Sequence, residues 1–152
     1  MKVWIDADAC PMPIREIILR AAVRRQISTT FVANSPLTLP QSEYIDFVHV
    51  DAGPDEADAF IADNSETGDL VVTQDIPLAA ILVPRGIVVI SPRGDSYNPD
   101  NIGDTLSRRN LMQELRDTGS ITGGPRPFSD KLKKQFANLF DSALQKLSAQ
   151  SK

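Results

Sequence analysis

Residues 3–13, Val-Trp-Ile-Asp-Ala-Asp-Ala-Cys-Pro-Met-Pro, hold the pattern from which the fold can be predicted. Val3-Trp4-Ile5 is a short apolar run typical of a buried strand, and it stops at Asp6. Pro11 and Pro13 follow, and proline suits the first turn of a helix, where backbone N–H groups lack intrahelical partners. The stretch therefore predicts a buried strand, acidic side chains at its end and a helix that begins soon after.

The rest of the chain alternates short β-branched runs with helical periods. From Ile14 to Arg25, apolar residues recur on one face, as in an amphipathic helix. Strands separated by helices predict an α/β fold, a three-layer sandwich around a mainly parallel sheet of about five strands. The further segments are strands at 29–33, 47–50, 70–73 and 86–90, helices at 55–64, 78–82, 104–116 and 129–148, and polar loops at 34–41, 91–101 and 120–128.

Length and composition indicate one globular domain over residues 1–152. The net charge of −4 argues against a globally basic nucleic-acid binder, but not against an enzyme that meets a polyanion through a bound cation. No apolar run is long enough to span a membrane. A single cysteine, Cys10, and the lack of a secretory leader predict a cytoplasmic protein. The last helix can pack on its own domain or on a second subunit, which leaves a homodimer open.

Carboxylates follow several of the predicted strands. Asp6 and Asp8 follow the first strand, Asp58 lies near the start of the helix after the third, and Asp75 follows the fourth. Open parallel sheets bind ligands beyond the carboxyl ends of their strands, so we expect these side chains to meet there. Clustered carboxylates demand a cation, and hard oxygen ligands suit Mg²⁺ or Mn²⁺. The sequence therefore predicts that these four aspartates bind a metal ion and act in catalysis.

Other acidic residues in the same region have simpler explanations. Asp55 stands where a helix cap is expected, and capping explains it as well as a functional role does. Asp51 ends a predicted strand, and Glu56 can interact with the helix dipole alone.

The motif at residues 6–11, Asp-Ala-Asp-Ala-Cys-Pro, resembles that of the bacterial YaiI/YqxD family, an uncharacterised protein family. The resemblance covers nearly the whole chain, and the family has no established activity to transfer. The other matching segments are residues 51–58 (DAGPDEAD), 71–79 (VVTQDIPLA), 91–94 (SPRG) and 122–128 (TGGPRPF).

More remotely, this family is similar to PIN-type and NYN-type nuclease domains, which commonly bind Mg²⁺ or Mn²⁺ and cleave RNA. The acidic positions of those domains would correspond to Asp6, to Asp58 or Glu56, and to Asp75 in Thr73-Gln74-Asp75. The similarity implies a PIN-like fold and a metal-dependent phosphodiesterase, first of all a nuclease acting on RNA.

One acidic position of such domains has no clear counterpart. After the fifth strand stands Ser91-Pro92-Arg93-Gly94, with Asp95 slightly later. The gap favours an alternative in which a PIN-like module binds nucleic acid, a nucleotide or a partner without turnover.

Several residues are candidates for contacting a substrate. Thr73 and Asn34 could add hydroxyl or amide contacts at the edge of the sheet. Arg93 and Arg126 lie in loops late in the chain, and arginine can hold phosphate through paired hydrogen bonds. For the pair Arg108-Arg109 a solvated helix face is the better interpretation.

Other chemistries fit less well. Asp6-x-Asp8 also resembles the opening of haloacid-dehalogenase-type phosphatases, but the Cys10 that follows and the single later Asp75 match them poorly. Residues 11–15 lack the glycine-rich cradle that a Cys10 nucleophile would need. His49 is the only histidine and lies inside a predicted strand, which favours a structural role and excludes a two-histidine zinc site.

Overall fold

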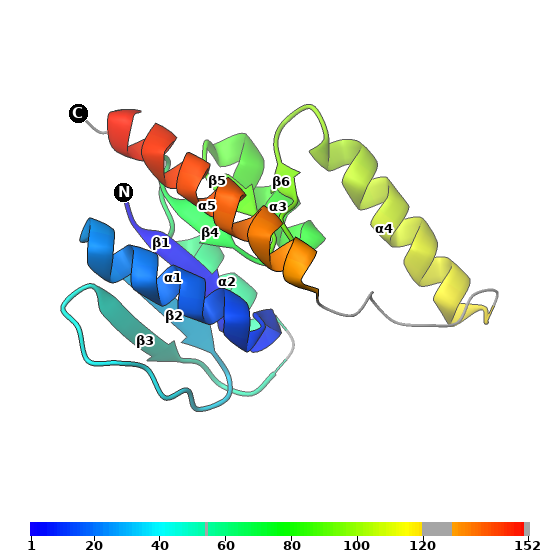
Figure 1. The fold of residues 1–152 in the computed structure, drawn as a ribbon. Helices are drawn as coiled ribbons and strands as arrows, with labels where there is room; N and C mark the ends of the chain where they lie inside the picture. Colours follow the sequence, from blue (N-terminus) through cyan, green and yellow to red (C-terminus); the bar gives the residue numbers. More distant parts are fainter. Residues whose placement is uncertain (54, 120–128, 151–152) are drawn as a thin grey trace.

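Six strands form one central sheet in the computed structural model, which describes residues 1–53, 55–119 and 129–150 (Figure 1). The strands are β1 (Val3–Asp6), β2 (Thr29–Ala33), β3 (Ile45–His49), β4 (Leu70–Val72), β5 (Val88–Ile90) and β6 (Ser96–Tyr97). Their order is β3-β2-β1-β4-β5-β6, and all neighbours are parallel except β5 and β6. The predicted α/β class and mainly parallel sheet are confirmed.

The sixth strand lies inside the segment 91–101 that the sequence predicts as a loop. β6 is two residues long and pairs antiparallel with β5, with Val89 opposite Tyr97 and Ile90 opposite Ser96. Two residues cannot produce an alternating pattern, so this strand leaves no periodic signal in the sequence.

Helices cover both faces of the sheet (Figure 1). The predicted helices form with small differences at their ends; the first begins at Met12 rather than Ile14, with Pro13 in its first turn. The helices are α1 (Met12–Arg25), α2 (Glu56–Asn64), α3 (Ile76–Leu82), α4 (Ile102–Asp117) and α5 (Asp130–Gln150), with short 3₁₀ turns η1 (Ala7–Ala9) and η2 (Val83–Arg85).

The side chains of each strand alternate between two separate cores, as strand geometry requires. In β1, Val3 and Ile5 pack with α1 and α5, whereas Trp4 packs with α2 and α3. In β4, Val71 belongs to the same core as Trp4. The three-layer sandwich is therefore confirmed, and it explains why β1, β2 and β4 are buried along their whole length.

The last helix, α5, packs against α1 and β5 of its own chain. Phe136 and Phe140 stack with 5.3 Å between their ring centroids and face the sheet beside α1. The sequence predicts an apolar stripe on this helix. Of its residues, Leu132 and Leu139 are partly buried, and the others are buried: Phe136, Phe140, Ala143, Leu144 and Leu147.

The helix α4 rests on α3 and projects beyond the sheet (Figure 1). The sequence predicts Leu106, Leu111 and Leu115 as core contacts, and for Leu111 this is wrong, because its side chain is 54% exposed. Residues five apart on a helix lie about 140° from each other around the axis, so Leu106 and Leu111 cannot face one core together.

The direction in which the chain leaves the sheet changes between β1 and β4. The chain leaves β1 towards α1 on one face, and it leaves β4 towards α3 on the other face. Such a switch in direction is where open α/β sheets bind ligands. Asp6 ends β1 at this switch point, and Thr73 directly follows β4 beside it.

Candidate acidic site at the sheet edge

Asp6 and Thr73 are buried side by side at the carboxyl ends of β1 and β4. Asp6 is 8% exposed and Thr73 is fully buried. The Thr73 hydroxyl donates a hydrogen bond of 2.9 Å to Oδ2 of Asp6, and it accepts one of 3.0 Å from the backbone N–H of Asp75. Thr73 thereby links the end of β1 to the loop that carries Asp75.

Asp75 is the N-cap of α3. Its Oδ1 accepts a hydrogen bond of 2.9 Å from the backbone N–H of Leu78, one of the groups that a helix start leaves without an intrahelical partner. The cap holds this carboxylate at the sheet edge, where the positive end of the helix dipole favours its charge.

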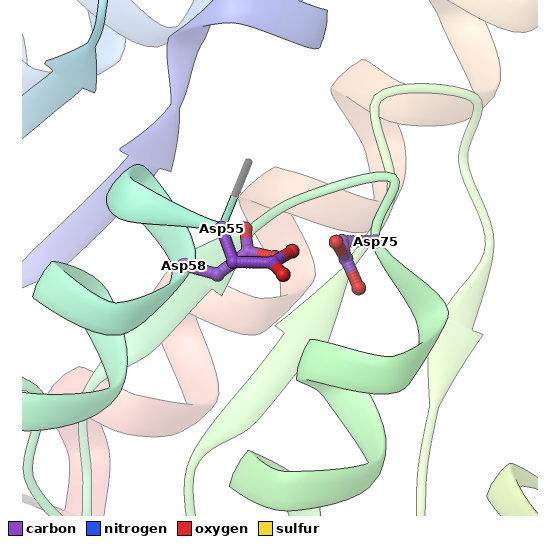
Figure 2. Close-up of side chains that lie close together, drawn as sticks. All are labelled: Asp55, Asp58 and Asp75. Atoms are coloured by element: carbon purple, nitrogen blue, oxygen red, sulfur yellow. The ribbon is translucent and has the colours of Figure 1, made fainter. Parts of the chain in front are cut away.

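Asp55 and Asp58 approach Asp75 from the start of α2 (Figure 2). One carboxylate oxygen from each of the three residues lies within 4.8 Å of the others. Asp55 is the N-cap residue by position, yet its side chain makes no capping hydrogen bond, and its φ of 67° is left-handed. The predicted cap therefore does not form, and the carboxylate of Asp55 faces the other two aspartates instead.

The close carboxylates change the acidity of the site. Burial raises the pKa of Asp58 to about 8, with a further contribution from a hydrogen bond to Asp75. The negative charges of Asp75, Asp6 and Asp55 add to this rise. Burial likewise raises the pKa of Asp6, partly offset by the hydrogen bond from Thr73. These carboxyls therefore hold protons, or require a cation, more than isolated aspartates do.

No basic side chain neutralises the three aspartates within the described part of the chain. The one ion pair found there joins Arg25 to Asp141, on the face covered by α1 and α5. The starts of α2 and α3 thus supply three carboxylates that form no salt bridge among the described residues. Carboxylate oxygens are hard donors, and this set is of the chemical type that binds Mg²⁺ or Mn²⁺.

Asp8 lies outside this group of three. It is exposed on η1, and both of its oxygens are engaged by the chain after β2. Oδ2 accepts from the backbone N–H of Asn34 at 2.8 Å, and Oδ1 accepts from the hydroxyl of Ser35 at 2.9 Å. The structure thus directs Asp8 to the loop that precedes β3, although its charge still contributes to the raised pKa of Asp6.

A cavity of about 480 Å³ opens beside the acidic cluster. It combines three carboxylates, an aliphatic wall and one guanidinium group. Its lining consists of Asp55, Asp58, Ala59, Ala62, Asp75, Pro77, Leu78, Ile81 and Arg109. A second cavity, of about 400 Å³, lies between β5, β6 and α5, and its mostly apolar lining holds no carboxylate for metal chemistry.

The other candidate contacts lie in different places. Asn34 is exposed, and its carbonyl oxygen lies 3.0 Å from Nε2 of His49, the last residue of β3. Arg93 lies half-buried in the turn after β5, at the same edge of the sheet. Arg126 falls outside the described residues. Thr73 contacts the acidic site directly, through Asp6 and the backbone of Asp75.

PIN-type and NYN-type domains have an acidic residue after the fifth strand, and no carboxylate from that segment of this chain joins the three aspartates. Ser91 follows β5, and its hydroxyl donates to Oδ2 of Asp95 at 3.2 Å and accepts from the Asp95 backbone N–H at 3.1 Å. Asp95 is therefore held by its own turn rather than by the three aspartates.

The sequence model of the family described as "Uncharacterized BCR, YaiI/YqxD family" matches residues 4–146. The chain belongs to the YaiI/YqxD family. A UPF0178 protein of Myxococcus xanthus is 53% identical over 147 residues, which are 97% of this chain and 96% of the relative. UPF0178 proteins of Syntrophobacter fumaroxidans and Marinobacter nauticus are 49% and 51% identical over 146 residues, 96% of this chain and 95% and 97% of the relatives.

No solved structure matches this YaiI/YqxD member, so its similarity to PIN-type and NYN-type domains stays an expectation from the sequence. None of its described helices combines the length and the apolar character that crossing a membrane requires.

Proposed function

We propose that this YaiI/YqxD member is a metal-dependent phosphodiesterase, first of all a nuclease acting on RNA, that uses Mg²⁺ or Mn²⁺. The observation that carries the proposal is the approach of Asp55, Asp58 and Asp75 to within 4.8 Å, with no salt bridge from a basic side chain to any of them among the described residues. Mutual repulsion of this kind is relieved when a divalent cation binds.

The residues would divide the work according to their positions. Asp58 and Asp75 would hold the ion, and Asp55 would join them as a third ligand. Asp6 would receive a proton from the attacking water or orient that water, since burial keeps its pKa high. Thr73, expected from the sequence to contact substrate, would instead position Asp6 and Asp75. Asp8, expected as a ligand, would hold the loop at Asn34.

A divalent ion at these carboxylates supplies an activated water and stabilises negative charge on a phosphate. It also offsets the repulsion between the site and an anionic substrate, which an acidic protein otherwise meets unfavourably. Arg93, Arg126 and Asn34 remain candidates for contacts with the substrate beyond the ion.

The test is cleavage of labelled single-stranded RNA and DNA, with Mn²⁺ and with chelator. We expect cleavage only with the metal, and a loss of about 10²-fold or more in Asp58→Asn and Asp75→Asn, as when groups that stabilise a transition state are removed. Asp63→Asn, an exposed position on the same helix α2, is the matched control and should stay active. Metal-dependent cleavage that persists in both cluster variants would contradict the assignment.

A second candidate function is a binding module without turnover. It is favoured by the turn at Ser91, where no carboxylate completes the cluster and Asp95 is held away by Ser91. Calorimetry with Mn²⁺ and nucleotides distinguishes the two candidates, because tight binding with no cleavage of any nucleic acid supports the module.

We also propose that the protein works in the cytoplasm, as its one buried cysteine suggests. A homodimer stays a prediction, and light scattering of the purified protein tests it.

A further inference from the structure

Arg109 lies on α4 and lines the same cavity as the three aspartates. α4 packs on α3, the helix that Asp75 caps, and this contact brings Arg109 to the cavity. Among the described residues that line the cavity, Arg109 is the one cation.

Arg109 forms no salt bridge with the three aspartates. It instead donates a hydrogen bond of 3.1 Å to Oδ1 of Asn110, a neighbour on the exposed surface of α4. An arginine that borders three carboxylates without pairing with them keeps its donors available for another anion. Arg108 precedes it on the same helix and does not line the cavity.

The wall between the two charged ends is aliphatic. It is formed by side chains from α2 and α3, including Ala59, Pro77 and Ile81, and Ile81 is 56% exposed. A volume of about 480 Å³ is within the usual range for a site that holds one small molecule. The cavity thus offers an acidic end for a cation, a basic end for a phosphate and an apolar wall for an uncharged group.

The geometry points to Arg109 as the residue that contacts the substrate phosphate, in a cavity that takes one nucleotide unit of a single-stranded phosphodiester. The phosphate lies between Arg109 and the metal-binding aspartates, and the nucleoside lies against Pro77 and Ile81. A base that is paired inside a duplex would have to leave its stack to enter, so single strands are preferred. This inference rests on the proposed function, whose metal site supplies the other contact to the phosphate.

The experiment measures binding of Mn²⁺ alone, and of AMP and adenosine with Mn²⁺ present, by calorimetry of the full chain. We expect Arg109→Gln to bind Mn²⁺ as the wild type does and to bind AMP about tenfold more weakly, since one charge-assisted contact is lost. Arg109→Lys should recover part of the affinity, because it restores the charge but not the paired hydrogen bonds. Arg108→Gln is the matched control and should bind AMP normally.

The outcomes separate the two proposals. Failure of the wild type to bind Mn²⁺ overturns the metal site and with it the proposed function. Normal Mn²⁺ binding together with equal AMP affinity in the wild type and Arg109→Gln overturns only the role of Arg109. AMP affinity no greater than that of adenosine overturns it too, since the phosphate would then contribute nothing.

Discussion

The hydroxyl of Thr73 connects two neighbouring strand ends by donating a 2.9 Å hydrogen bond to the carboxylate of Asp6. Both residues are buried, and the same hydroxyl accepts the backbone N–H of Asp75. One side chain thus positions a carboxylate from β1 and another from the start of α3.

Thr73→Val should lower the free energy of unfolding by about 1–3 kcal/mol, because it leaves Asp6 and the N–H of Asp75 without this partner in a buried place. Valine has nearly the same shape, so the loss reports the hydrogen bonds rather than packing. Urea unfolding followed by the fluorescence of Trp4, the only tryptophan, measures it. Thr73→Ser keeps the hydroxyl and should lose less; a valine variant as stable as the wild type would contradict this account.

The stability of the metal-free protein should fall as pH rises from about 5 to about 8. The pKa of Asp58 is about 8 in the folded protein and about 4 in an unfolded chain, so the folded state keeps a proton that the unfolded state has released. The stability from this group is complete below about pH 4 and is lost as pH passes through 8. After allowance for the solvent that reaches this half-buried carboxyl, the loss is about 1–3 kcal/mol.

Thermal unfolding between pH 5 and 8.5, with chelator, measures this effect. Asp58→Asn should flatten the slope, whereas Asp63→Asn on the same helix should keep it. Added Mn²⁺ should raise the melting temperature most at the upper end of the range, because the ion competes with the proton and binds the folded state. A slope that is unchanged in Asp58→Asn would show that another group titrates.

Asp55→Asn should weaken Mn²⁺ binding about tenfold and leave the metal-free protein at least as stable. Asparagine tolerates the left-handed φ of 67° about as well as aspartate does, so the change removes charge without adding backbone strain. Asp55→Ala adds that strain and should cost about 1 kcal/mol or more in addition. Calorimetry and urea unfolding of the two variants separate charge from conformation, and equal Mn²⁺ affinity in all three proteins would exclude Asp55 as a ligand.

The contrast between Asp55 and Asp58 shows how far the sequence predicts this site. Asp58 and Asp75 could be placed at one sheet edge because they lie near predicted strand ends and helix starts, and such positions converge in a parallel sheet. The left-handed conformation of Asp55 could not be foreseen, since nothing in the local sequence requires a positive φ at this aspartate. The sequence leaves Asp55 open between a helix cap and a functional role, and its side chain makes no capping hydrogen bond.

The surroundings of Asp8 and of Arg109 on α4 could likewise not be predicted from the local sequence. Asp8 lies two residues after Asp6, and both of its carboxylate oxygens accept hydrogen bonds from Asn34 and Ser35. The alternation of side chains that holds along a strand ends where the strand ends. Likewise, Arg109 looked like part of a solvated face because nothing in its local sequence reveals that α4 crosses α3 beside the acidic cavity.

Cys10 should resist thiol reagents in the folded protein. It is 2% exposed, and burial raises the pKa of its thiol to about 12, which the charge of Arg15 only partly offsets. At pH 8 the thiolate population is then about 10³-fold smaller than in an unfolded chain, where the thiol has a pKa of about 8.5. Iodoacetamide labelling with and without urea, followed by mass spectrometry, compares the labelling rates of Cys10 in the folded and unfolded protein. Rapid labelling of the folded chain would contradict this prediction and support a nucleophilic role for Cys10.

Asp69 is a buried aspartate whose carboxylate is satisfied by hydrogen bonds. Its replacement should lower the stability of the fold and leave metal binding at the acidic site unchanged. Its carboxylate accepts hydrogen bonds from the backbone of Lys2 at 3.0 Å, from the indole of Trp4 at 3.1 Å and from the backbone of Glu66 at 2.8 Å. These contacts lie at the amino ends of β1 and β4, across the sheet from Asp75.

Asp69→Ala should therefore lower the free energy of unfolding by about 2–4 kcal/mol, because three donors lose their acceptor. Asp69→Asn keeps an acceptor oxygen and should lose less. At a temperature where both variants are folded, Mn²⁺ affinity should equal that of the wild type, since the two ends of the sheet share no side-chain partner among the described residues. Reduced affinity in a fully folded Asp69→Asn would mean that the register of β1 and β4, and not the acidic residues alone, determines the metal site.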